Sequence, residues 1–487
     1  MEVTLIGLVL ILIGTAMLVF GGLRSVFLLL LVSGLFGGSA AIQLPALGGS
    51  SIPPTQLALL FVYLRLLMPG GGYFSALPES LTNNFWLLIF TMFGVATAFI
   101  SPRLFAGTIH VFPMSYQFSR GMFDTLPLHP TSQNITAAFY ILGSFLAAVA
   151  AYVTCRFSDG SRTLVSAGIA IGWIHVIVGL AAVVTRNTPA DVVFEFFRNA
   201  NYAQLDDAYG SFVRIRGIFA ETSSYTTFAF AFFVLNAELW YRSIRTRATG
   251  ATAFALAAVL FFSTSSTAYF GLAVYLAFLT GRFLLFPFKG AMSKVRSLMF
   301  ASGLLLFLVA ILLAAIPSLP QAIYDMLTQM TVGTSDSTSA QQRMFWAMQG
   351  WHVFIESYGI GIGPGSFRSS SIVTAMLGSV GIFGCATFLL YLYNVLQPWR
   401  RSTFMATDDL ESDLGGAFGT AAVLCLLPAA ISAPDPQPGI NFSVMAGAAL
   451  AMRPRSFIST ARQGTQRLVG KAAGVEAPAS GRQQKLA

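Results

Sequence analysis

The chain has 487 residues, of which 55% are hydrophobic and only 10% are charged, and its mean hydropathy is +0.71. A soluble domain carries roughly 25% charged residues, so this composition excludes a soluble protein and indicates a polytopic membrane protein. The formal net charge is +9, and seven basic residues against one acidic residue lie from position 453 onward. An anionic lipid surface accounts for such a tail, so no nucleic-acid partner is implied.

Apolar runs of spanning or nearly spanning length recur along the whole chain. The run 251–285 is too long for one span, and the polar residues 263–267 divide it into a hairpin. The sequence therefore predicts an all-α polytopic membrane protein with about 12–13 transmembrane helices, occupying residues 1–452. The predicted segments are 5–22, 26–44, 56–68, 85–100, 135–154, 164–185, 222–241, the two halves of 251–285, 298–316, 372–396, 415–433 and 440–452.

Three long polar loops separate these segments, at about 101–133, 186–220 and 317–371. Of the 28 Lys and Arg residues, eight lie in the long loops, and the other 20 lie in short loops, at helix ends or in the tail. The positive-inside rule then predicts that the long loops are extracytoplasmic and that the tail 453–487 is cytoplasmic. The composition of that tail is typical of a disordered segment.

The third long loop holds an unusual stretch that begins at Arg343 and ends at Arg368, with His352 between them. A helical first part is followed by a glycine run that cannot continue a helix. Such a run lets the backbone approach a substrate closely or hinges the loop. His352 is either a proton acceptor or a helix-face histidine packed among aromatic side chains. The glycines of the run are Gly359, Gly361, Gly363 and Gly365.

A second candidate group precedes the predicted helix 222–241. Arg216 and Glu221 are five positions apart, which is about 140° around a helix, so an ion pair along one helix does not explain them. Glu221 has two interpretations. It is either a proton acceptor or a favourable charge at a helix N-terminus, with Thr222 or Ser223 as the cap.

These motifs resemble the O-antigen ligase and O-antigen polymerase superfamily of bacterial membrane glycosyltransferases, over roughly residues 130–400. The resemblance rests on R-x-x-x-x-E-x-S at 216–223, on the Ser/Thr-interrupted hairpin near 265, and on G-I-G-P-G-S-F after an Arg in the third loop. Polymerases of this superfamily carry an Arg, fifteen residues and a Gly, as Arg343 and Gly359 do. The companion pattern with ten intervening residues is missed, since eleven separate Arg198 from Gly210.

Two further features bear on the choice between polymerase and ligase. The stretch LHPTSQNIT at 128–136 is similar to one found in exopolysaccharide polymerases. Ligases resemble this chain in having a His in the same loop, at His352, but the surroundings usual for ligases are absent. The resemblance therefore favours polymerisation of undecaprenyl-diphosphate-linked repeat units into an O-antigen or exopolysaccharide, at the periplasmic face of the inner membrane.

The residue types fit this chemistry independently of the family resemblance. A diphosphate leaving group needs its developing charge stabilised, and the planar Arg guanidinium suits phosphate oxygens. We expect Arg216, Arg343 and Arg368 to bind the diphosphate, and Glu221 or His352 to take the proton of the acceptor hydroxyl. Widely spaced Cys and His residues predict no metal site and no cofactor.

The expected partners are the lipid-linked glycan, membrane lipid and, in the cell, a chain-length regulator and a flippase. Two alternatives stay open. One is a ligase that transfers the glycan to lipid A core or to another acceptor. The other is a polysaccharide-related transporter or flippase, for which ionisable residues within spans would be the sign.

Overall fold

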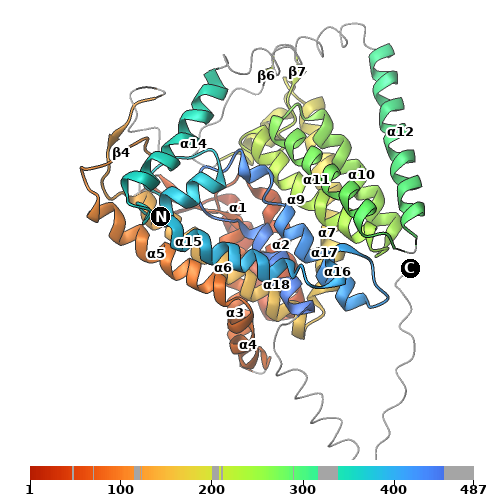
Figure 1. Cartoon of the computed structure of the whole chain (residues 1–487), viewed down its shortest axis with the longest axis horizontal. Coiled ribbons are helices and arrows are strands. Elements are labelled where there is room, and N and C mark those ends of the chain that lie inside the picture. The colour runs from red at the N-terminus through yellow and green to blue at the C-terminus, as the bar shows by residue number, and fades with distance from the viewer. Residues whose placement is uncertain are drawn as a thin grey trace, which may run out of the picture.

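The computed structural model describes residues 1–45, 49–69, 71–114, 121, 123–199, 208–209, 212–288, 290–315 and 338–453. Helices dominate these residues, which confirms an all-α, multi-pass membrane protein (Figure 1). Each predicted segment overlaps one α-helix. In chain order these are α1 (Leu5–Phe20), α2 (Leu23–Ser33), α3 (Pro54–Leu67), α5 (Phe85–Leu104), α6 (Ser132–Phe157), α7 (Gly160–Val184), α9 (Thr222–Tyr241), α10 (Thr246–Phe262), α11 (Ser266–Leu285), α12 (Ala291–Ala315), α15 (Ile372–Leu396), α17 (Leu410–Leu424) and α18 (Ile440–Met452).

Helix α9 is the centre of the bundle. Among the described residues, seven helices are long and apolar enough to cross a membrane and five more are shorter apolar helices; α9 has 20 residues but belongs to neither set. It packs against α7, α10, α11 and α17, and nearly all of its side chains are buried. Because protein surrounds it, α9 can carry polar residues such as Asn236 and Glu238 that a lipid-facing helix would avoid.

The bundle has two different ends. We call the end where α6, α9 and α15 begin the loop end, and the end where they finish the basic end. All three long loops meet the loop end, since the backbone N–H of Arg368 donates to Phe112 O (3.1 Å) and that of Ala40 donates to Asn199 Oδ1 (2.8 Å). Arg24, Arg156 and Arg242 lie at the basic end.

Short elements complete the two ends. A three-stranded antiparallel sheet in the order β1-β2-β3 and two two-stranded sheets, β4–β5 and β6–β7, lie at the loop end. The strands are β1 (Glu2–Val3), β2 (Ile42–Leu44), β3 (Ser50–Ile52), β4 (His110–Val111), β5 (Leu126–Pro127), β6 (Ala208–Tyr209) and β7 (Phe212–Val213). The remaining helices are η1 (Gly34–Phe36), η3 (Tyr73–Ala76), α4 (Leu77–Asn83), α8 (Asp191–Phe196), α14 (Thr338–Glu356), α16 (Arg401–Phe404) and η5 (Pro428–Ala430).

The predicted second segment, 26–44, is too long, because α2 ends at Ser33 and β2 occupies its last residues. The two glycines after η1 explain the break. A Cβ at Gly37 would lie 2.4 Å from the Phe219 ring, and one at Gly38 would lie 2.2 Å from Ile218 O. The chain therefore uses its glycines to pass close to the segment before α9 instead of extending the helix.

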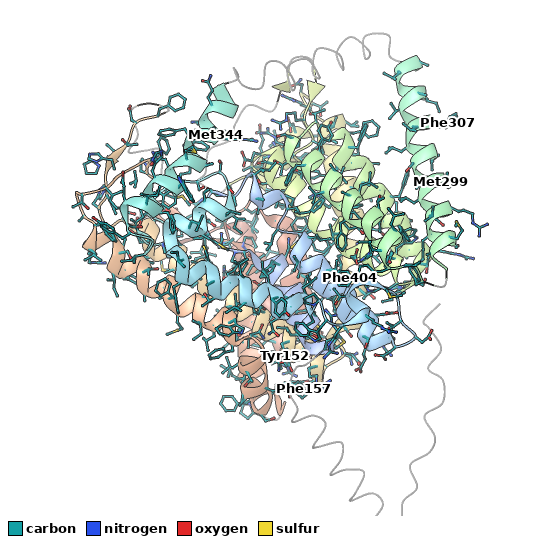
Figure 2. The ribbon with its side chains drawn as sticks, viewed as in Figure 1. Tyr152, Phe157, Met299, Phe307, Met344 and Phe404 are labelled. Atoms are coloured by element: carbon teal, nitrogen blue, oxygen red, sulfur yellow. The ribbon has the colours of Figure 1, made fainter. Side chains whose placement is uncertain are left out.

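Other boundaries shift by a turn or two. Helix α12 begins at Ala291, so that Lys294 falls within it, and Met299 and Phe307 of α12 are exposed at the edge of the molecule (Figure 2). Arg453, predicted to start the tail, instead follows α18 directly as a buried side chain. Residues 316–337 of the third loop and 454–487 of the tail lie outside the described part of the chain.

Candidate functional site

A second, smaller hydrophobic core builds the loop end. It contains side chains of the first long loop, such as Ile109 and Leu128, together with Val353 of α14 and with Ile362 and Phe367 that follow it. Phe112 extends the contact between the first long loop and α14, because its ring packs against those of Phe345 and Trp346. The stretch 343–368 is therefore a packed part of the fold, resting on the first long loop.

The glycine run adopts the backbone that the sequence predicts. Gly359, Gly361, Gly363 and Gly365 all have positive φ, between 76° and 90°. A Cβ at Gly363 would lie 2.4 Å from Thr97 O of α5, and one at Gly365 would lie 2.3 Å from Gln133 O of α6. The close backbone approach is thus made to neighbouring helices. These contacts describe a fixed turn, and the predicted hinge stays a prediction.

Arg343 and Arg368 lie in neighbouring segments. Ser370 Oγ donates to the backbone carbonyl of Arg343, which ties the start of α14 to the residues after Arg368. The Arg368 guanidinium is half-buried, and its Cζ lies 4.6 Å from the centre of the Trp346 ring, a cation–π geometry. One turn of α14 separates Arg343 from Trp346, so both arginines belong to the same side of this helix.

His352 lies on the other side of α14. It is nine residues after Arg343, which places it about half a turn away around the helix axis. The side chain is exposed, and its neighbour Trp351 and the nearby Ile355 are 45% and 56% exposed. The structure therefore does not bring His352 together with the two arginines. It is also not packed in an aromatic core, which contradicts the second interpretation; its role as a proton acceptor stays a prediction.

Glu221 occupies the N-cap position of α9, with extended backbone (φ −145°, ψ 160°). We expected Thr222 or Ser223 to cap this helix; instead, Ser223 Oγ donates to Glu221 Oε1 at 2.7 Å, and Ser224 Oγ lies 3.5 Å from the same oxygen. The half-buried carboxylate is thereby oriented at the helix N-terminus, where negative charge is favoured. This geometry is compatible with either role of Glu221.

Arg216 precedes α9 in a fixed turn. Its carbonyl accepts from the N–H of Phe219 at 2.9 Å, and Gly217 next to it has φ 53°. The turn is anchored by Arg198, whose Nε and Nη2 donate to Gly217 O at 3.2 and 2.6 Å. Arg198 is buried and serves this contact, which gives a structural reason for an arginine that the spacing of the sequence left unexplained.

The loop 425–439, between α17 and α18, contacts elements that carry both groups. At its start, η5 packs against α9, α11 and α15. The same loop reaches the Arg368 segment, because the N–H of Ser369 donates to Pro434 O at 3.0 Å. One loop therefore contacts both helix α9, which begins after Arg216 and Glu221, and the segment that contains Arg368.

This loop contributes Asp435, a carboxylate that the sequence analysis did not consider. Its two oxygens accept from the backbone N–H (3.1 Å) and the side-chain Nε2 (3.2 Å) of Gln437. Burial raises the pKa of Asp435 to about 6, although the Gln437 hydrogen bonds and the Arg368 charge act to lower it. The only signal in the sequence was an acidic residue between Pro434 and Pro436, just before an apolar segment.

The arrangement offers cations and a carboxylate with a pKa near neutrality on one membrane-adjacent surface. Across the described ranges, no cluster of three His, Cys, Asp or Glu side chains is placed to share a metal ion. Comparisons with family models, with curated proteins and with solved structures find no match for this chain. The function must therefore be argued from the residues themselves.

Proposed function

We propose that the protein is a membrane glycosyltransferase that polymerises oligosaccharide repeat units carried on undecaprenyl diphosphate, acting at its loop end. The observation that carries this proposal is the placement of Arg368, stacked on Trp346 and within electrostatic reach of Asp435. A permanent cation held beside a titratable carboxylate suits a reaction in which a diphosphate leaves and a hydroxyl loses its proton. The positive-inside rule predicts that this end is the periplasmic one.

In the proposed reaction, an acceptor sugar hydroxyl attacks the anomeric carbon of the donor glycan. The new C–O bond forms as the bond between that carbon and the diphosphate oxygen breaks, and undecaprenyl diphosphate leaves with the bonding electrons. Arg368 and Arg343 stabilise the charge that develops on the diphosphate. Asp435 accepts the hydroxyl proton, a role for which it replaces His352 because His352 faces away from the arginines.

Arg216 and Glu221 lie at the start of α9, a helix that also contacts this loop, and we assign them to the second lipid-linked substrate. We assign Arg216 to a diphosphate and leave Glu221 as the alternative proton acceptor. The two carboxylates are distinguished by their settings. Glu221 accepts hydrogen bonds from two serine hydroxyls at a helix N-terminus. Asp435 instead has a raised pKa and lies within electrostatic reach of Arg368.

The transporter alternative depends on ionisable residues inside spans, and Glu238 is the clearest example. Its carboxylate accepts from Arg242, from Tyr275 Oη (3.0 Å) and from Arg282 Nη1 and Nη2 (2.8 and 2.9 Å). A carboxylate with this many donors is a structural tie between α9 and α11 and does not need a transported ion. The cluster therefore gives the transporter alternative no specific support.

The test is gel analysis of surface glycan and lipid-linked intermediates in a deletion strain complemented with wild type, Arg368→Ala, Arg343→Ala or Arg103→Ala. Arg103 is the matched control, because it is an exposed loop-end arginine that donates to a carbonyl of its own helix. We expect single repeat units without polymer for the first two variants and full polymer for the control. Long chains left on the lipid carrier would indicate a ligase, and an unchanged profile in all variants would refute the glycosyltransferase.

A further inference from the structure

A cavity of about 230 Å³ opens at the loop end, where the two motif segments of the sequence meet. One wall comes from the residues after β5 and the first turn of α6, and the other from Gly365 and Ser366 at the end of the glycine run. Asn134 joins these walls, because its Nδ2 donates to Pro364 O (2.8 Å) and to Ser366 Oγ (2.9 Å). The cavity is therefore built by tertiary contacts that fix both walls.

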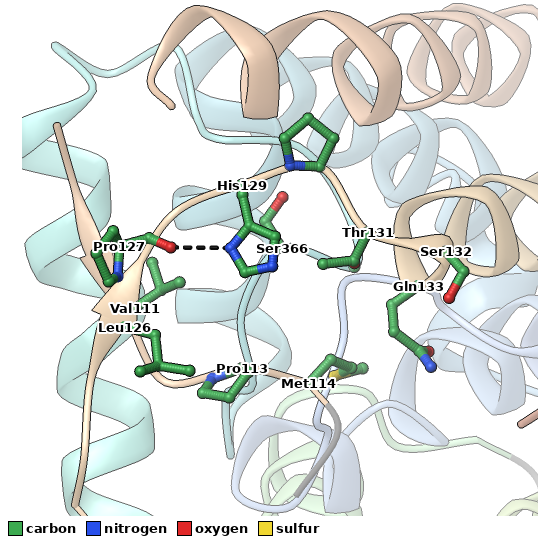
Figure 3. Close-up of a pocket in the computed structure, with 12 residues that line it drawn as sticks. Val111, Pro113, Met114, Leu126, Pro127, His129, Thr131, Ser132, Gln133 and Ser366 are labelled. Carbon is green, nitrogen blue, oxygen red and sulfur yellow. Dashed lines mark hydrogen bonds between the residues drawn. The ribbon is translucent and has the colours of Figure 1, made fainter. Parts of the chain in front are cut away.

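The lining combines polar and apolar side chains (Figure 3). Ser132 and Gln133 lie at one end of the cavity, and Val111 and Leu126 lie at the other end together with His129. His129 Nδ1 lies 3.1 Å from the carbonyl of Pro127, which can only accept, so Nδ1 carries the proton. In the neutral ring Nε2 is then an acceptor, and elsewhere in the lining Ser132 and Gln133 contribute a hydroxyl and an amide that both donate and accept.

Among the residues that the structure describes, the lining of this cavity contains no Lys or Arg. Its combination of neutral donors and acceptors with apolar side chains suits a sugar ring, which presents hydroxyls around its edge and C–H groups on its faces. The volume is below the roughly 300–1,000 Å³ of sites for drug-sized ligands. It therefore suits one ring better than a whole oligosaccharide.

The cavity adjoins the candidate site. Ser366 in its wall is two residues before Arg368, and the carbonyl of Phe112, which accepts from the Arg368 N–H, is next to Pro113 of the lining. A glycan whose diphosphate or reacting hydroxyl lies at Arg368 can thus extend into the cavity. We propose that this cavity binds a single sugar ring of the glycan substrate, with His129, Ser132 and Gln133 reading its hydroxyls; this rests on the proposed function.

The test is saturation-transfer NMR on the purified full-length protein in detergent, with glucose, galactose, mannose and N-acetylglucosamine as separate probes. We expect at least one sugar to bind, and His129→Ala or Gln133→Ala to weaken its binding roughly fivefold, as the loss of one hydrogen bond predicts. Ser132→Trp should abolish binding by filling the cavity. His110→Ala is the matched control, because His110 is exposed on the same β4–β5 sheet but does not line the cavity.

Binding that survives His129→Ala, Gln133→Ala and Ser132→Trp alike would overturn the proposal, as would the absence of binding for every sugar tested.

The glycan gel separates this failure from failure of the proposed function. If Arg368→Ala abolishes polymer but no sugar binds, the function stands and the cavity assignment falls. If a sugar binds in the cavity but polymer is independent of Arg368, the sugar site stands and the polymerase falls. In a reconstituted assay, Gln133→Ala raises the half-saturating concentration of whichever substrate, donor or acceptor, supplies the ring.

Discussion

The two ends of this membrane bundle use charge in opposite ways. At the basic end, Glu238, Arg242 and Arg282 are almost completely buried, and both arginines form ion pairs with Glu238. Arg242 also donates to the carbonyls of Ser402 and Thr403, at 3.0 and 2.9 Å, which holds α16 in place. At the loop end, Arg343, Arg368 and Asp435 are only half-buried; Arg343 lies on α14, and the other two lie on segments that connect helices.

This difference separates charges that serve the fold from charges that can serve a ligand. A buried charge is tolerated only when its partners satisfy it, and breaking such a cluster is costly. A half-exposed arginine on a packed but membrane-adjacent segment can still direct its guanidinium toward a substrate phosphate. The following variants test that distinction, from the largest expected effect to the smallest.

Glu238→Ala should have the largest effect on stability. It leaves the guanidinium groups of Arg242 and Arg282 buried without their carboxylate, which we expect to cost about 3–5 kcal/mol. The measurement is the amount of protein in the membrane, together with its thermal unfolding in detergent. Arg24→Ala is the control at the same end, because the Arg24–Asp159 pair is more than half exposed and contributes at most about 1 kcal/mol. Equal stability of the two variants would contradict a structural role for Glu238.

Arg368→Ala should abolish activity while leaving the fold intact. Removing one preorganised cation from a site of developing charge costs roughly 10²- to 10³-fold in rate. The rate of polymer formation by purified protein measures this loss, and the melting temperature should stay close to that of the wild type. Arg368→Lys keeps the charge but loses the planar fork, so we expect an intermediate rate. A variant that is inactive only because it has unfolded would place Arg368 with the structural charges.

Asp435→Asn should remove the dependence of rate on pH near neutrality. A carboxylate accepts a proton only when it is ionised, so with a pKa of about 6 the wild-type rate should fall as the pH is lowered through 6. The asparagine variant should be slow, and its pH–rate profile should lack this fall at acid pH (the acid limb). Because the Arg368 charge lowers the pKa of Asp435, Arg368→Gln should move any residual limb to higher pH. An acid limb that persists in Asp435→Asn would move the proton acceptor to Glu221.

His352→Ala should have the smallest effect, less than about twofold on rate, since surface substitutions away from a site are usually close to neutral. The same polymerisation assay checks it, with Arg343→Ala as the comparison from the other side of α14. A large loss of rate in His352→Ala with unchanged protein level would show that the exposed side of α14 reaches the substrate.

Much of the fold could be predicted from composition and periodicity. Apolar runs located all thirteen segments, and the polar cluster near Ser265 divided the hairpin correctly, with Thr264 at φ 51° in its turn. The end of α2 could not be predicted, because the glycines after it do not interrupt the apolar run 26–44 in the sequence. What stops the helix is contact with Phe219 and Ile218, about 180 positions away in the sequence.

The candidate site was only partly predictable, for two physical reasons. Helical phase alone could have shown that Arg343 and His352 face opposite sides of α14. Asp435 gave no comparable signal, because a single acid between prolines has no spacing from which to infer a role. Its relation to Arg368 arises only when the loop 425–439 packs beside the third long loop.

The most direct test of the account is the release of undecaprenyl diphosphate by the purified protein in liposomes supplied with the lipid-linked repeat unit. We predict that one lipid diphosphate is released for each new glycosidic linkage, that Arg368→Ala loses this release, and that Arg103→Ala retains it. Release that is absent from the wild type, or equal in wild type and Arg368→Ala, would contradict the assignment of the loop end as a glycosyltransferase site.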